Sequence, residues 1–261
     1  MERKKLVSAA LAVVCALGLA PLALGAVITA FTFENLSTGV NNSPAPEVGV
    51  GTATPLGMTN NFTPSPSITS ADVLSNPGSS TPSLAWRIRG NGDAPNNGNG
   101  WAAAAPQYSQ GAEFFTSTLG FQDIVLTYDW RPTTQGVKHQ QVQYTSDGNT
   151  WTNVGPLQVG PGSEAWVNGI MIDLSAIPAV NNNPAFGVRI VSAYAPDGPN
   201  AGQYVNLAGN PINSTSGNWR LDSITFSGNA IAVPEPASAL LLVCAVGGCC
   251  LARRGRRSVT G

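Results

Sequence analysis

Apolar and polar residues alternate in several short stretches of the chain. From Ile124 to Trp130 every second residue is large and apolar, and the pattern recurs from Val142 to Tyr144 and from Phe186 to Ile190. A period of two places the apolar side chains on one face of a strand, against a core. The pattern therefore predicts a β-rich chain.

Eight strands are predicted in this way. They are Val27–Phe33, Leu84–Arg89, Glu113–Thr118, Asp123–Arg131, His139–Ser146, Trp166–Asp173, Phe186–Tyr194 and Trp219–Ser227. The stretch Asn41–Pro82 is rich in Pro, Ser, Thr and Asn, which predicts long loops or an irregular edge. Asp147-Gly148 is expected to supply the two positive φ angles of a tight hairpin turn, with Trp151 on the returning strand.

The final predicted strand does not alternate cleanly, because the apolar residues Leu221 and Ile224 have opposite parity. A bulge near Asp222 or Ser223 would bring both side chains to the same face. We expect this strand to pair with the first strand.

Short strands with long loops are typical of an all-β, antiparallel two-sheet sandwich, and the expected form is jelly-roll-like. The 29 glycines and 20 prolines fit this turn-rich class and argue against a helical bundle. The sandwich is expected to span residues 26–230 as one domain.

Charge is distributed unevenly. The formal net charge is −1, but seven of the 13 basic residues lie at the two ends, and residues 26–230 carry six basic and twelve acidic residues, a formal charge of −6. Nucleic-acid binding needs a positive field, so that class is excluded. All four cysteines lie in the apolar ends, which leaves the body without disulfide or thiolate chemistry.

The N-terminal residues 1–25 have the organisation of a signal peptide. Charged residues 2–5 precede the apolar run Leu6–Ala20, and small residues follow up to Gly25, where cleavage is expected. We therefore expect export through the Sec machinery and signal peptidase. A permanent membrane anchor is the alternative, and it would export the body equally.

The C-terminal residues carry a second topogenic pattern. Val233, Pro234, Glu235 and Pro236 precede the apolar run 237–252, and Arg253, Arg254, Arg256 and Arg257 follow it. Sixteen helical residues reach about 24 Å, which is a marginal span of a hydrocarbon core about 30 Å thick. The arginines favour the cytoplasm, so this transmembrane helix would leave the body outside.

This arrangement over residues 233–257 resembles the PEP-CTERM sorting signal. The resemblance implies recognition by an exosortase, a membrane-embedded cysteine transpeptidase that cuts near Pro-Glu-Pro and releases the body or transfers it to the cell surface. The body itself resembles the jelly-roll bodies of exported PEP-CTERM proteins and, more distantly, carbohydrate-binding modules.

Catalytic patterns are scarce. His139 is the only histidine and Lys138 the only lysine of the body, so His-dependent triads and multi-His metal sites have no second candidate. His139 is expected to be a solvated residue at a strand start. A carboxylate pair could still hydrolyse a glycosidic bond. Its members would come from the following acids: Glu113, Asp123, Asp129, Glu164 and Asp173.

A structural calcium ion is a further expectation. Pairing of the first and last strands would bring Glu34 and Asp222 together, and two carboxylates repel each other unless they are protonated, separated or bridged. The alternative is that Asp222 pairs with Arg220 or Arg189.

Sugar binding would use exposed aromatic rings, with polar side chains nearby for the hydroxyls. Trp101, in a polar glycine-rich loop, and Tyr108 are the candidates. In the alternative, Trp101 folds back onto the sheet and plugs it.

These observations predict a non-enzymatic, exported β-sandwich. It would be an inner-membrane-anchored precursor that is sorted to the cell surface or extracellular matrix. Its expected role is structural or adhesive, with weak contact to extracellular polysaccharide. The alternative function is a secreted glycan hydrolase.

Overall fold

A computed structural model of the protein describes residues 25–34, 44–57, 85–89, 100–212 and 216–232. These residues form ten strands and one short 3₁₀ helix. The elements are β1 (Ala26–Phe31), β2 (Gly51–Leu56), β3 (Trp86–Arg89), β4 (Gly111–Thr116), β5 (Phe121–Pro132), β6 (His139–Thr145), β7 (Thr152–Val159), β8 (Val167–Asp173), η1 (Pro178–Val180), β9 (Gly187–Ala193) and β10 (Asn218–Ala230).

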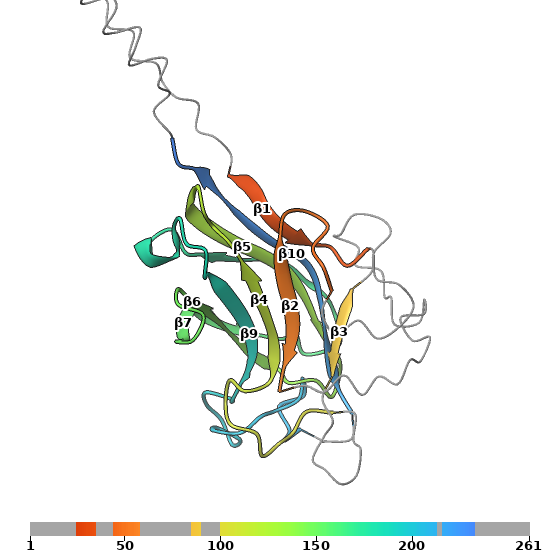
Figure 1. Ribbon diagram of the computed structural model, residues 1–261. Helices are drawn as coiled ribbons and strands as arrows, with labels where there is room; N and C mark the ends of the chain where they lie inside the picture. Colours follow the sequence, from red (N-terminus) through yellow and green to blue (C-terminus); the bar gives the residue numbers. More distant parts are fainter. Residues whose placement is uncertain (1–24, 35–43, 58–84, 90–99, 213–215, 233–261) are drawn as a thin grey trace, which may run out of the picture.

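The strands form two antiparallel sheets. Sheet A has the order β1-β10-β5-β8, and β3 also pairs with β10; sheet B has the order β2-β4-β9-β6-β7. Figure 1 shows the two sheets as separate layers, with β1 and β10 side by side up to the described ends of the chain. The predicted all-β class with two antiparallel sheets is confirmed.

One hydrophobic core lies between the sheets. Sheet A contributes the alternating residues from Ile124 to Trp130, each at most 1% exposed, and sheet B contributes Phe114, Val142, Val188 and Ile190, each fully buried. The period of two in the sequence thus marks the inward faces of both sheets. By the same alternation, Glu113, Gln143 and Arg189 face away from the core.

The pairing of the first and last strands is as predicted. β1 and β10 are antiparallel neighbours, with Phe31 opposite Ile224. The register of β10 against β5 shifts between Asp222 and Thr225, and Ser223 has a φ of 53°. Leu221 and Ile224 are both fully buried, so the predicted bulge is present and aligns them on the core.

Two local predictions differ from the structure. The stretch Asn41–Pro82, expected to form long loops or an irregular edge, contains β2, a regular strand at the edge of sheet B that includes Pro55. Proline is tolerated at an edge, where its missing N–H interrupts no ladder, and that is why the pattern was missed.

The turn between β6 and β7 also differs. The hairpin is present, but only Gly148 has a positive φ, so the expectation of two positive φ angles is wrong. The Asp147 carboxylate organises the turn instead, because it accepts the N–H groups of Thr150 (2.7 Å) and Asn149 (2.8 Å). These hydrogen bonds hold the pKa of Asp147 well below its usual value.

Candidate functional site

Trp101 is fully buried. Its ring lies against the ring of Trp219, with centroids 4.5 Å apart. The next residue is fixed by Gln110, whose side chain accepts the N–H of Ala102 (2.8 Å) and donates to its carbonyl (3.0 Å). In this position the Trp101 ring has no exposed face on which a sugar could stack. Trp101 instead folds back onto the sheet, as the alternative prediction states.

Tyr108 is partly exposed and has a φ of 67°. Its N–H donates to the carbonyl of Ser192 at 3.0 Å, which ties the segment before β4 to β9. The backbone of Tyr108 is therefore fixed against sheet B, and the residue is partly exposed there.

Glu34 and Asp222 lie near the same end of the β1/β10 pair, beyond the register pair of Phe31 and Ile224. Glu34 is partly buried and Asp222 fully buried. Directly opposite Asp222 on β5 is Asp129, a second buried acid, which residue spacing does not place there. No group of three or more His, Cys, Asp or Glu side chains able to hold a metal occurs in the described residues.

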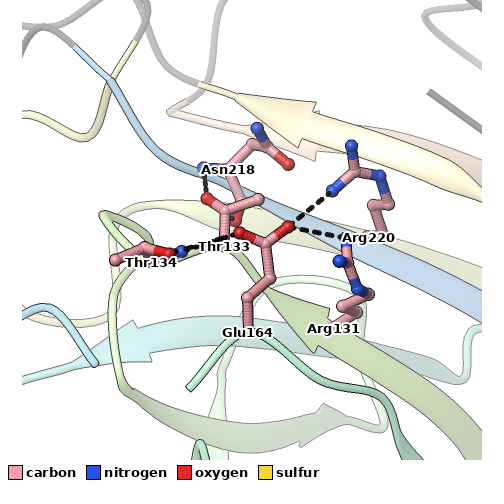
Figure 2. Close-up of polar contacts among 6 residues, drawn as sticks. All are labelled: Arg131, Thr133, Thr134, Glu164, Asn218 and Arg220. Atoms are coloured by element: carbon pink, nitrogen blue, oxygen red, sulfur yellow. Dashed lines mark hydrogen bonds and ion pairs between the residues drawn. The ribbon is translucent and has the colours of Figure 1, made fainter. Parts of the chain in front are cut away.

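An ion-pair cluster lies beside the two aspartates on sheet A. Glu164 forms an ion pair with Arg131 at 2.8 Å and lies 3.9 Å from Arg220, and these two arginines are opposite each other on β5 and β10. Figure 2 shows both arginines on one side of the Glu164 carboxylate and Thr134 on its other side. The N–H and hydroxyl of Thr134 donate to Glu164 at 3.2 and 3.3 Å.

Beside the ion-pair cluster, Thr133 and Asn218 join the end of β5 to the start of β10 by hydrogen bonds. The N–H of Thr133 donates to the Asn218 carbonyl (3.0 Å), and the N–H of Asn218 donates to the Thr133 hydroxyl (2.9 Å). Figure 2 shows this pair next to the carboxylate. Both arginines and the acid are thus engaged within the protein, which favours a structural role for the cluster.

The outward face of sheet B carries a different arrangement. One residue from each strand lies in a single row across the sheet, with every neighbour in register. We call these residues the polar row: Thr54, Glu113, Arg189, Gln143 and Asn153.

Four of the five side chains of the polar row are linked to one another. Arg189 Nε donates to Gln143 Oε1 at 2.6 Å, and Gln143 Nε2 donates to Asn153 Oδ1 at 2.6 Å. The Arg189 guanidinium also lies 3.8 Å from Glu113. Burial raises the pKa of Glu113 against the opposing effect of Arg189, and burial lowers the pKa of Arg189.

Two aromatic rings adjoin the polar row. Phe115 and Trp151 are partly exposed and meet edge to face, with centroids 5.8 Å apart. The Arg189 guanidinium carbon lies 4.5 Å from the centroid of the Trp151 ring. A side chain at Gly187 would meet ring carbons of Phe115 at 2.7 Å, so glycine allows this ring to lie against the sheet.

The sequence contained a partial signal for this face. The alternation from Phe186 to Ile190 placed Arg189 outward, and Trp151 was expected on the returning strand. The pairing of β4, β9 and β6 could not be deduced from spacing, so neither Glu113 nor Gln143 could be assigned to the same row.

His139 begins β6 as predicted, but it is only 7% exposed, so the expectation of a solvated histidine is wrong. Burial lowers its pKa, and the nearby charge of Lys138 lowers it further against the opposing effect of Asp197. Among the described residues, no hydrogen-bond partner lies within reach of its Nδ1.

Of the predicted signal peptide, residues 1–25, all but Gly25 lie outside the described residues, and so do the predicted sorting signal 233–257 and its predicted helix 237–252. Within the part of the chain that is described, no helix has the length and apolar character needed to cross a membrane. No protein-family model and no curated protein matches the chain.

Proposed function

We propose that the protein is exported and sorted through its C-terminal signal to the cell envelope or extracellular matrix. Its non-catalytic β-sandwich has a structural or adhesive role there, with weak glycan contact. The partners are the Sec machinery, signal peptidase, an exosortase-type enzyme and extracellular polysaccharide. The sequence patterns at residues 1–25 and 233–257 support this address.

The structural observation that supports this address is the pairing of the first and last strands, β1 and β10. Ala26 lies opposite Gly228, and the two strands continue together to the described ends of the domain (Figure 1). Both topogenic segments are therefore attached at one edge of the sandwich. A body attached in this way can be held at the membrane from one side while its sheet faces remain available.

We also propose that the sandwich is a jelly roll. Without the edge strands β2 and β3, eight strands remain, and they can be numbered 1 to 8 in chain order. Sheet A, β1-β10-β5-β8, then has the order 1-8-3-6, and sheet B, β4-β9-β6-β7, has the order 2-7-4-5. Two four-stranded sheets of this kind are the form that double-sheet jelly rolls take.

The contacts of the candidate acids support a non-catalytic role over a glycan hydrolase. Glu113 faces Arg189 and Glu164 binds Arg131. The remaining three acids accept hydrogen bonds from neighbouring groups: Asp123 from Asn229 (3.2 Å), Asp129 from Gly169 (2.6 Å) and Asp173 from Ser175 (2.8 Å). A hydrolytic pair needs one acid and one base turned toward a shared substrate position, and these contacts hold the acids elsewhere.

Surface labelling of intact cells tests the proposed address. We expect the wild-type chain to be labelled by a membrane-impermeant reagent, and the variant lacking residues 234–261 to change its destination and maturation. Exclusive recovery of the wild-type chain from the cytosol would overturn the address. Sustained release of reducing sugar by the purified chain would favour the hydrolase instead.

A further inference from the structure

The exposed face of sheet B presents hydrogen-bonding groups that are fixed in advance. Arg189 is held by Gln143, by Glu113 and by the ring of Trp151, and Gln143 is itself bonded to Asn153. A ligand that meets such groups does not have to order them, which lowers the entropic cost of binding.

The same face presents apolar ring surface beside these groups. Phe115 and Trp151 adjoin the polar row, and Gly187 leaves the space in which the Phe115 ring lies. A pyranose has a C–H face that packs on an aromatic ring and a rim of hydroxyls that need both donors and acceptors. The rings and the polar row supply these two requirements side by side.

The charges of the face indicate which glycans it suits. The polar row contains one acid, Glu113, and one base, Arg189, so it has no net charge to attract a polyanion. A uronic acid polymer would also meet a body with a formal charge of −6. A protein partner is less suited, because Thr52, Thr54 and Asn153 are exposed and interrupt the apolar surface.

We infer that the outward face of sheet B, built from the polar row with Phe115 and Trp151, binds a neutral polysaccharide. The inference rests on the adhesive function proposed above and gives it a site and a ligand class. Arg189, Thr54 and Asn153 bind hydroxyl groups of the polymer, and the two rings contact its C–H faces. Gln143, which is only 5% exposed, holds Arg189 and Asn153 in place beneath them.

Affinity gel electrophoresis of the full-length chain in a sugar-free detergent tests this inference. Dextran, mannan and hydroxyethyl cellulose serve as neutral polymers, and alginate and polygalacturonate serve as acidic ones. We expect at least one neutral polymer to retard the chain, with retardation insensitive to added salt. Failure of all three neutral polymers, or salt-sensitive preference for an acidic polymer, would overturn the inference.

Variants then locate the site. Trp151→Ala should weaken binding about tenfold, the loss expected when an aromatic anchor is removed. Trp166→Ala, which removes the same side chain from the segment before β8, is the matched control and should bind as the wild type. Unchanged binding by Trp151→Ala, or equal losses in both variants at unchanged melting temperatures, would overturn the assignment to sheet B.

Arg189→Lys separates geometry from charge. The arginine side chain stacks on Trp151 and at the same time donates through Nε to Gln143. Lysine keeps the positive charge, but its single ammonium group cannot make both contacts. We expect it to lose binding like Trp151→Ala, and full retention would overturn the proposed role of the polar row. A chain that is labelled at the cell surface and binds no neutral polymer refutes this inference alone and leaves the proposed address intact.

Discussion

The indole rings of Trp101 and Trp219 lie 4.5 Å apart, and both side chains are fully buried. Trp219 also meets Trp130 at 5.4 Å and donates its Nε1–H to the carbonyl of Val137 at 2.7 Å. The segment that leads into β4 is thereby anchored to sheet A. Trp101 is part of the core and holds the described segment before β4 against it.

Trp101→Ala should therefore destabilise the protein by about 3–5 kcal/mol, the usual cost of truncating a buried aromatic side chain. Urea denaturation followed by near-UV circular dichroism measures the change. Trp151→Ala, at a partly exposed position, should cost much less. If Trp101→Ala unfolded at the same urea concentration as the wild type, the plug assignment would be wrong. Trp101→Phe covers the case in which the alanine variant does not fold.

Glu164→Gln tests the ion-pair cluster on sheet A. The change leaves the nearly buried side chains of Arg131 and Arg220 without their shared carboxylate. Because Glu164 itself is about one-third exposed, we expect a loss of about 1–2 kcal/mol, toward the low end for charged pairs. Asp197→Asn, which changes an exposed acid, is the matched control and should change the free energy of unfolding little at neutral pH, where His139 is uncharged. A loss that persists unchanged in high salt would argue against an electrostatic cause.

The strands were predictable because burial on one face enforces a period of two. From Ile124 to Trp130 each inward residue is large and apolar, and the predicted strand matches β5 within two residues at its start and one at its end. β2 was not predictable in this way, because Ala53 is the only buried residue in Gly51–Leu56 and the strand shows no alternation. Pro55 is also a residue that is rare in strands.

The sites were less predictable, because they depend on which strands become neighbours. Composition identified Trp101 as an aromatic residue in a polar loop, and only the fold places it against Trp219. Likewise, Asp129 and Asp222 are far apart in sequence and become opposite residues through the β5/β10 register. Residue spacing contains no information on that register.

His139 should make stability depend on pH. Its pKa in the folded protein lies below the ordinary value of 6.5, so the unfolded chain takes up the proton first as the pH falls. The stabilisation is fully present above about pH 6.5 and is lost as the pH drops toward the folded pKa. Urea midpoints measured from neutral to mildly acidic pH should fall for the wild type.

His139→Asn should remove that part of the pH dependence. Lys138→Gln should reduce it, because the Lys138 charge contributes to the lowered pKa. Asp197 acts in the opposite direction, so Asp197→Asn should enlarge it. Identical pH profiles for His139→Asn and the wild type would show that another group titrates in this range.

The placement of Asp222 opposite Asp129 raises the question of what neutralises two buried carboxylates. Two carboxylates directly opposite each other on paired strands repel unless one is protonated or a counter-charge lies close. Arg131 and Arg220 are a register pair of the same two strands, two residues further along each. These two arginines are therefore an alternative source of positive charge to the calcium ion predicted between Glu34 and Asp222.

Calcium titration distinguishes the two counter-charges. A bridging ion predicts that millimolar calcium raises the melting temperature of the full chain, that a chelator reverses the rise, and that Glu34→Ala abolishes it, because binding to the folded state alone stabilises it. Glu47→Gln is the control, since Glu47 binds the N–H of Thr32 at 2.7 Å and is no part of the predicted site. If neither the wild type nor Glu34→Ala responds, the arginines suffice and the calcium prediction fails.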